Sequence, residues 1–230
     1  MFDTTVADGV CQLSLSPSGA GRDARWLVTG PGGGYRRDPA AYNVTVPEGF
    51  DRTDLAAYAD ERRQAAGFVI GGPALLTGVE MRHARGARRG PVTAVATVGL
   101  SNPVALADTG GSDRQPDPAG TVNLLLGTTR ALSDGALGTL LATAVEVKAA
   151  TLQTTTGFTG TTSDAVAVGS DPGGEPARFA GSATTVGRAA RVCVGAAVRD
   201  ALAARGSVPS SVAAADHGTV APGECQRFRP

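Results

Sequence analysis

Several residue types that would point to a defined class of protein are scarce in this chain of 230 residues. Aromatic side chains make up 4% of the sequence, so a core must be built mainly from Ala, Val and Leu. The formal net charge is +0 and no block of one charge stands out, which argues against a nucleic-acid partner or an anionic membrane surface. With 42% hydrophobic residues, the chain can still bury the core of one large domain or two small ones.

Cysteine and histidine are also few. The three cysteines, Cys11, Cys193 and Cys225, are odd in number, widely spaced and without a CxxC pair, which excludes a disulfide framework of the secreted kind. Cys193 lies in an apolar helical pattern, so we expect it in the core. The two histidines, His83 and His217, belong to no HExxH motif or His/Cys cluster, so we predict no metal site.

Motifs of several enzyme classes and of export are missing as well. No GxSxG segment supports an α/β-hydrolase triad, and no GxGxxG segment after a strand supports a dinucleotide fold. The N-terminal segment MFDTTVADGVCQ lacks the charged and apolar regions of a signal peptide, and no apolar run reaches the ~18 residues of a membrane helix. We therefore expect a cytoplasmic protein without a membrane partner, and the sequence leaves the oligomeric state open.

Hydrophobic periodicity predicts both strands and helices. Short runs of alternating apolar and β-branched residues predict strands at Val10–Leu15, Arg25–Val28, Asn43–Val46, Ala74–Thr77, Pro91–Leu100, Thr121–Leu126, Asp164–Val168 and Arg178–Ala180. Helical spacing predicts a short helix from a Thr53 cap to about Gln64, and long helices from Ser133 to near Gly157 and from about Thr184 to Ala204.

These elements predict an α/β or α+β fold with one domain over residues 1–206. In this fold a mixed β-sheet is covered by two long helices and one shorter helix. Residues 107–120 predict a polar surface loop, because acids, prolines and glycines are concentrated there. Residues 207–230 lack periodicity, and we expect a mobile C-terminal tail.

Lys148 is the only lysine, against twenty arginines. An ammonium group is a compact charge whose pKa shifts readily, whereas a guanidinium is planar and always charged, so this lysine is a candidate for a site that needs an ammonium. At about 100° per residue, Lys148 shares a helix face with Leu137, Leu141, Ala144 and Leu152. Its side chain either reaches past this apolar face to water or points into a pocket.

Glu146 lies about 200° around the same helix from Lys148. Its neighbours on that face have short side chains, so we expect packing there and a partly buried carboxylate. Such a carboxylate is a candidate general base, although a structural hydrogen-bond acceptor is at least as common. In a straight helix, Glu146 and Lys148 cannot both face one substrate atom.

Two further segments place polar groups beside predicted strands. Residues 159–164 (TGTTSD) are rich in hydroxyls and offer backbone N–H groups to an oxygen-rich ligand, or form an ordinary turn. Asn123 lies inside an apolar strand, where a buried amide must be hydrogen-bonded, either within the sheet or to a ligand.

Five segments, read in order, resemble the adenosylcobinamide amidohydrolase family. They are VTAVATVGLSNP (residues 92–103), GTVNLLLGTTRALSDGAL (120–137), ATAVEVKAATLQ (142–153), FTGTTSDAVAVG (158–169) and FAGSATTVGRAAR (179–191). The family pattern is a Gly-Thr-[Ile/Val]-Asn strand, a Thr-x-x-Glu-x-Lys-x-x-x-Leu helix, a Gly-Thr-x-[Thr/Ser]-Asp turn and a Gly-Ser-x-Thr-x-x-Gly helix start. One departure is Ala183, where members often have His. If that His takes part in proton transfer, this chain must do without it.

The resemblance implies hydrolysis of the amide between the aminopropanol arm and the corrin ring of adenosylcobinamide, or of a related cobamide, to give adenosylcobyric acid for cobamide salvage. The corrinoid is then a small-molecule substrate, and no cofactor is implied. Amide hydrolysis needs a base, charge stabilisation at the carbonyl oxygen and a proton for the amine.

Motif position and residue chemistry assign these roles. We expect Glu146 or Asp164 as general base, and Lys148, Asn123 or N–H groups of residues 160–162 around the oxyanion. Thr161 or Thr162 is a less favoured nucleophile, because the sequence reveals no base for it. The expected substrate-binding residues are Thr121, Asn123, Gly160, Thr161, Thr162 and Ser182.

Two other interpretations stay open. One is a non-catalytic corrinoid-binding module with the same pocket. The other is an unrelated α/β domain whose Glu, Lys and Asp only satisfy internal hydrogen bonds. Convergence of Asn123, Lys148 or Glu146, Thr161 and Asp164 on one cleft would favour a site over that last interpretation.

Overall fold

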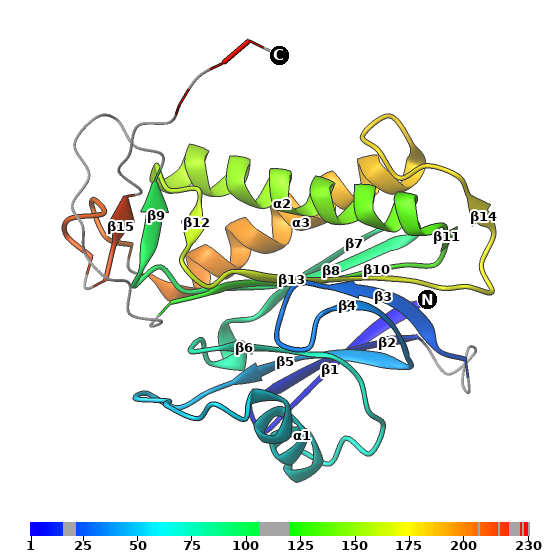
Figure 1. The fold of residues 1–230 in the computed structure, drawn as a ribbon, viewed down its shortest axis with the longest axis horizontal. Helices are drawn as coiled ribbons and strands as arrows, with labels where there is room; N and C mark the ends of the chain where they lie inside the picture. The colour runs from blue at the N-terminus through cyan, green and yellow to red at the C-terminus, as the bar shows by residue number, and fades with distance from the viewer. Residues whose placement is uncertain are drawn as a thin grey trace.

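Two β-sheets are stacked face to face and carry helices on both outer faces (Figure 1). The computed structural model describes residues 1–15, 22–105, 120–206, 208–215, 217–220, 226 and 228–229. The layers are, in order, a short helix, a four-stranded sheet, a six-stranded sheet and two long helices. The expected mixed α/β single domain is confirmed, but its strands form two main sheets where we predicted one.

The six-stranded sheet has the order β4-β3-β13-β10-β8-β7. Its strands are β3 (Ala24–Val28), β4 (Gly34–Asp38), β7 (Arg85–Arg89), β8 (Val92–Val98), β10 (Val122–Thr128) and β13 (Ala165–Ser170). The central strands β10 and β13 are parallel, so they begin at the same edge of the sheet. Both are buried along their whole length, which explains their almost continuously apolar sequences.

The four-stranded sheet has the order β1-β2-β5-β6. Its strands are β1 (Phe2–Ala7), β2 (Val10–Leu15), β5 (Ala40–Thr45) and β6 (Ala74–Thr77). Its inner face packs on the six-stranded sheet, where the Phe2 ring meets the Trp26 ring edge-on at a centroid distance of 5.7 Å. Helix α1 (Leu55–Ala65) covers the outer face and packs Tyr58 against a cluster that contains Tyr42.

The long helices α2 (Asp134–Thr156) and α3 (Thr185–Arg205) cover the other face of the six-stranded sheet. The predicted start of α2 at Ser133 is confirmed, because the Ser133 side chain accepts a hydrogen bond from the Ala136 N–H. Thr184 caps α3 in the same way and accepts a hydrogen bond from the Gly187 N–H. Each helix ends where predicted, at Gly157 (φ 80°) and Gly206 (φ 76°), whose left-handed conformation favours glycine.

The sequence pattern missed three edge strands, which are β1 (FDTTVA), β4 (GYRRD) and β7 (RGARR). Edge strands commonly carry charged side chains, because one side of the strand has no partner and faces water. Charged residues then replace the apolar alternation by which a strand is recognised in the sequence. The basic stretch of residues 82–89 is largely at the surface and contains β7. Within it, Arg88 pairs with the Asp3 carboxylate at 2.9 Å.

Two predicted boundaries were wrong. The residue that caps α1 is Asp54, not Thr53, and its side chain makes no capping hydrogen bond. The strand expected at residues 178–180 lies earlier, as β14 (Pro176–Ala177), because it pairs with β11 (Ala131–Leu132) just before α2 begins. A short 3-10 helix, η2 (Met81–His83), precedes β7.

A small third sheet has the order β12-β9-β15, with β9 at Pro103–Ala105, β12 at Gly160–Thr161 and β15 at Thr219–Val220. Strand β15 belongs to the expected tail and runs parallel to β9. The domain boundary at residue 206 stays a prediction. Most of the polar loop expected at residues 107–120, and also Cys225, lies outside the described residues.

Cys11 and Cys193 are free and buried, and Cys193 packs in the core as expected. Burial raises the pKa of Cys11 to about 12 and also raises the pKa of Cys193. Both thiols therefore stay protonated at neutral pH.

Among the described residues, α2 alone is long and apolar enough to cross a membrane by length and composition. Half of its apolar window is buried against the rest of the protein, as in the core helix of a soluble domain. The cytoplasmic location stays a prediction.

Candidate active site

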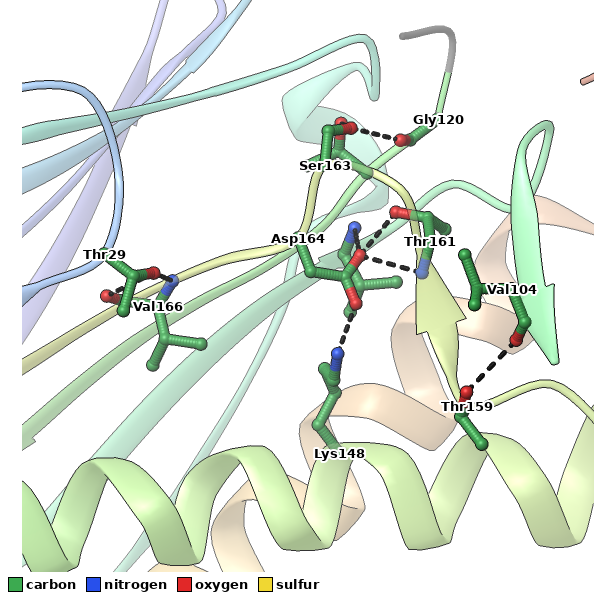
Figure 2. A network of polar contacts seen from close by, with 11 residues as sticks. Thr29, Val104, Gly120, Lys148, Thr159, Thr161, Ser163, Asp164 and Val166 are labelled. Carbon is green, nitrogen blue, oxygen red and sulfur yellow. Dashed lines mark hydrogen bonds and ion pairs between the residues drawn. The ribbon is translucent and has the colours of Figure 1, made fainter. Parts of the chain in front are cut away.

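A buried ion pair joins the middle of α2 to the residue before β13. Lys148 Nζ donates a hydrogen bond to Asp164 Oδ2, and the two side chains are only 8% and 14% exposed. Figure 2 shows Lys148 rising from the helix to the carboxylate. Of the two orientations that the sequence left open, the structure therefore has the inward one, in which the ammonium meets a carboxylate instead of water.

The Asp164 carboxylate accepts hydrogen bonds from three separate segments (Figure 2). Besides Lys148, its donors are the Val122 N–H at 2.9 Å, the Thr161 N–H at 3.1 Å and the Thr161 hydroxyl. One side chain thus ties the start of β10 and the β12–β13 turn to α2. The Thr161 N–H is engaged by this carboxylate, so our expectation that it is free to bind an oxyanion is wrong.

Hydroxyl groups surround this carboxylate on the same edge of the sheet. The Ser163 hydroxyl donates to the Gly120 carbonyl at 2.8 Å. The Thr121 hydroxyl lies 3.2 Å from the Ser163 hydroxyl. The Asn102 amide donates to the Thr162 hydroxyl at 2.5 Å. Residues 159–164 therefore form a hydrogen-bonded turn that also presents hydroxyls beside a carboxylate.

A cleft of about 480 Å³ opens between the ends of the two main sheets. Thr121, Ser163 and Asp164 line its wall on the six-stranded sheet, and residues 29–31 extend this wall after β3. The other wall comes from the end of β6 and from the connection between β5 and α1, including Phe50 and Arg52. In the part of the chain that the structure describes, no three His, Cys, Asp or Glu residues are grouped as around a metal ion.

Gly160 leaves room for the ion pair because it has no side chain. A Cβ atom at this position would overlap with Asp164 Oδ2 and lie 2.9 Å from Lys148 Nζ. We predicted that Gly160 offers a backbone N–H to the substrate. The structure indicates a different reason for glycine, which is that any side chain would push the two charged groups apart.

Gly160→Ala is therefore expected to lower the free energy of unfolding by about 1–3 kcal/mol, because the added methyl group overpacks a filled position. Urea denaturation measures this change. Gly138→Ala on α2 is the control, since its Cβ meets nothing within 4 Å and alanine favours a helix by up to about 1 kcal/mol. Equal stability of the two variants would contradict this account of Gly160.

Asn123 lies behind the cleft and is fully buried between the sheets. Its amide Nδ2 donates to Asn43 Oδ1 at 2.9 Å and to the Leu76 carbonyl at 2.8 Å, so it links β10 to β5 and β6. Both amide protons are engaged, and the expectation that Asn123 donates to an oxyanion is wrong. Its buried Oδ1 has no hydrogen-bond partner among the described residues.

Glu146 and Ser182 lie away from the cleft. The expectation that Glu146 is partly buried is wrong, because its side chain is 60% exposed and pairs with Arg191 of α3 at 2.8 Å. The side chains next to Glu146 are short because α3 packs closely against this face of α2. The longer Glu146 side chain extends past this contact to the surface. Exposed Ser182 accepts a 3.4 Å hydrogen bond from the same Arg191. Ser182 and Ala183 lead into α3, whose first residue lies beside the last residues of β10. The cleft lies at the first residues of β10, and the length of this strand separates the two places by roughly 20 Å.

The sequence analysis missed the residues of the facing wall, Phe50 and Arg52 above all. A usable signal was present: aromatic residues are scarce, and one of them precedes α1 beside charged side chains. Gly30 and Pro31 of the Gly-rich segment after β3 also line the cleft.

A carboxylate and hydroxyls line one cleft, and an ammonium group that does not itself line the cleft pairs with this carboxylate. These are the groups that a hydrolase of the acid–base type uses. The model of the adenosylcobinamide amidohydrolase family matches residues 18–209. This chain belongs to the adenosylcobinamide amidohydrolase family, as the resemblance of its motifs suggested, and membership identifies it as a hydrolase.

Two curated relatives named adenosylcobinamide amidohydrolase agree with this assignment. The protein of Halobacterium salinarum is 50% identical over all of both chains. That of Methanosarcina mazei is 30% identical over 80% of this chain and 92% of its own. Among solved structures, a Burkholderia sp. β-aminopeptidase is similar with a TM-score of 0.45 and 16% identity, over 86% of this chain and 80% of that chain.

Proposed function

We propose that this protein hydrolyses the amide bond between the aminopropanol arm and the corrin ring of adenosylcobinamide, or of a related cobamide. The products would be adenosylcobyric acid, which re-enters cobamide synthesis, and the free aminopropanol. The observation that supports this proposal most is the meeting of Lys148 and Asp164 beside the cleft that Asp164, Thr121 and Ser163 line. Family membership supplies the substrate class.

In this proposal Asp164 is the general base. Its Oδ1 already accepts from Val122 and Thr161, whereas Oδ2 accepts from Lys148 only and keeps a lone pair for water. As the water oxygen attacks the amide carbon, its proton passes to Asp164 and the carbonyl electron pair moves to oxygen. Collapse of this intermediate breaks the C–N bond, and the departing nitrogen takes the proton from Asp164.

Lys148 is the proposed stabiliser of the oxyanion. One of its three N–H donors is engaged by Asp164, so the others can turn to a carbonyl oxygen that gains negative charge. A covalent route through the Thr161 hydroxyl is the less favoured candidate, although this hydroxyl does donate to Asp164.

The size of the cleft indicates how the substrate would bind. A volume of about 480 Å³ is in the range that encloses a drug-sized ligand. A corrin ring with its amide side chains is larger than that. We therefore place the amide-bearing arm inside the cleft and the ring across its rim, where Thr29 and Ser163 offer hydroxyl groups.

Incubation with adenosylcobinamide in ¹⁸O-labelled water tests the proposal. We expect a carboxylate product that carries one ¹⁸O atom, together with unlabelled aminopropanol, because only the acyl carbon receives the water oxygen. Mass spectrometry measures both. Recovery of intact ligand with a raised melting temperature would instead indicate a non-catalytic corrinoid-binding module. Intact ligand without such a shift would contradict both functions.

A further inference from the structure

Arg52 stands at the cleft with four of the five N–H donors of its guanidinium group already engaged, along both edges that present two donors. Nε and Nη2 donate to the two oxygens of Asp54, and Nη1 and Nη2 donate to the two oxygens of Glu61. The two carboxylates hold the planar group in one orientation. Its carbon Cζ lies 5.1 Å from the centre of the Tyr58 ring, which covers one face.

This arrangement excludes the usual role of an arginine at a ligand site. A phosphate or carboxylate binds two donors along one edge of the guanidinium, and both such edges are occupied by Asp54 and Glu61. The hydrogen bonds from Arg52 also lower the pKa of Asp54 and of Glu61, so both stay ionised and the three groups together carry a net negative charge. An anionic ligand would be repelled here, whereas a neutral or cationic one would not.

The part of Arg52 that remains available is the flat face turned away from Tyr58. The side chain is 35% exposed and lines the cleft. Phe50 lines the same wall, and its ring packs against Tyr58 with a centroid distance of 4.7 Å. In a chain with so few aromatic residues, this wall therefore combines an aromatic ring with an oriented guanidinium plane.

We propose that Phe50 and Arg52 form a stacking surface for the adenine ring of the adenosyl group. Aromatic rings and guanidinium planes are the two surfaces on which proteins stack nucleobases. The proposal rests on the proposed function, because adenosylcobinamide supplies the adenine. The corrin ring is a second flat group that such a surface accepts, so the experiment must separate the two.

Photolysis in air separates them. Light breaks the cobalt–carbon bond and oxygen oxidises the Co(II) that forms, which leaves aquacobinamide with the ring and the arm unchanged. Kd and kcat/KM are measured for the same preparation in the dark and after photolysis. The proteins are the wild type, Arg52→Lys, which keeps the charge but not the plane, and Phe50→Leu, which keeps apolar packing. Arg82→Lys is the control, since Arg82 also pairs with a carboxylate, that of Glu80, but does not line the cleft.

We expect Arg52→Lys and Phe50→Leu each to weaken binding of adenosylcobinamide about tenfold, and to change binding of the photolysed ligand less than twofold. Arg82→Lys changes neither. Equal losses for both ligands, or no loss for either, would overturn the adenine contact and leave the proposed function standing. A wild-type protein that neither hydrolyses nor binds either preparation would instead contradict the proposed function. If Arg52→Lys unfolds, Phe50→Leu tests the same surface.

Discussion

Asp164→Asn is expected to lower kcat for adenosylcobinamide at least a hundredfold, the scale on which general acid–base catalysis contributes. Asparagine has nearly the same shape and can still accept hydrogen bonds from the Val122 and Thr161 N–H groups through its carbonyl oxygen. It cannot take a proton from water at neutral pH. Turnover assays by chromatography measure the loss, and circular dichroism checks that the fold is kept.

Glu146→Gln is the matched control for Asp164→Asn. It makes the same chemical change in a carboxylate of the neighbouring helix, but at an exposed position that pairs with Arg191. We expect a rate within about twofold of the wild type, since an exposed ion pair contributes little to stability. A large loss in Glu146→Gln with near-normal turnover in Asp164→Asn would reverse the assignment of the base.

Lys148→Met is expected to lower the free energy of unfolding by about 3 kcal/mol and to abolish measurable turnover. Removal of one partner of a buried ion pair leaves the other charge uncompensated, and this costs more than the pair itself contributes. Here the stranded charge is the Asp164 carboxylate, which keeps its hydrogen bonds to Val122 and Thr161. Urea denaturation at pH 7 gives the loss of stability.

Two further variants separate charge pairing from catalysis. The double variant Lys148→Met/Asp164→Asn should recover much of the lost stability, because no buried charge is left alone, but none of the activity. Lys148→Arg keeps the positive charge but replaces a compact ammonium by a larger planar fork, and we expect it to remain inactive. Turnover by Lys148→Arg at the wild-type rate would contradict the inference that this site needs an ammonium group and not a guanidinium group.

Local sequence signals predicted most of the secondary structure correctly. Helices α2 and α3 begin at Ser133 and Thr184 and end at Gly157 and Gly206, because capping hydroxyls and left-handed glycines act within one turn of the chain. Buried strands such as β10 and β13 were equally clear. The charged edge strands were not, because their conformation depends on a neighbouring strand and not on burial of an apolar face.

Local sequence signals also identified some residues of the candidate site and misjudged others. The scarcity of lysine singled out Lys148, and the hydroxyl-rich turn before β13 singled out Asp164. Glu146 was misjudged, because a helix sequence shows which residues share a face but not what packs against it. Asn123 was correctly expected to be hydrogen-bonded, but its partners on β5 and β6 belong to a second sheet that no local pattern announced.

The order of residues along this chain therefore settled its helix ends, its buried strands, its family and the unusual chemistry of one lysine, since each of these depends on neighbours a few positions away or on a motif. The stacking of two sheets, the pairing of Lys148 with Asp164 and the cleft with its Phe50–Arg52 wall depend on segments that lie up to 136 residues apart, from Thr29 to Ala165 in the cleft. Their contacts form only when apolar faces are buried together, and burial is a property of the folded chain as a whole.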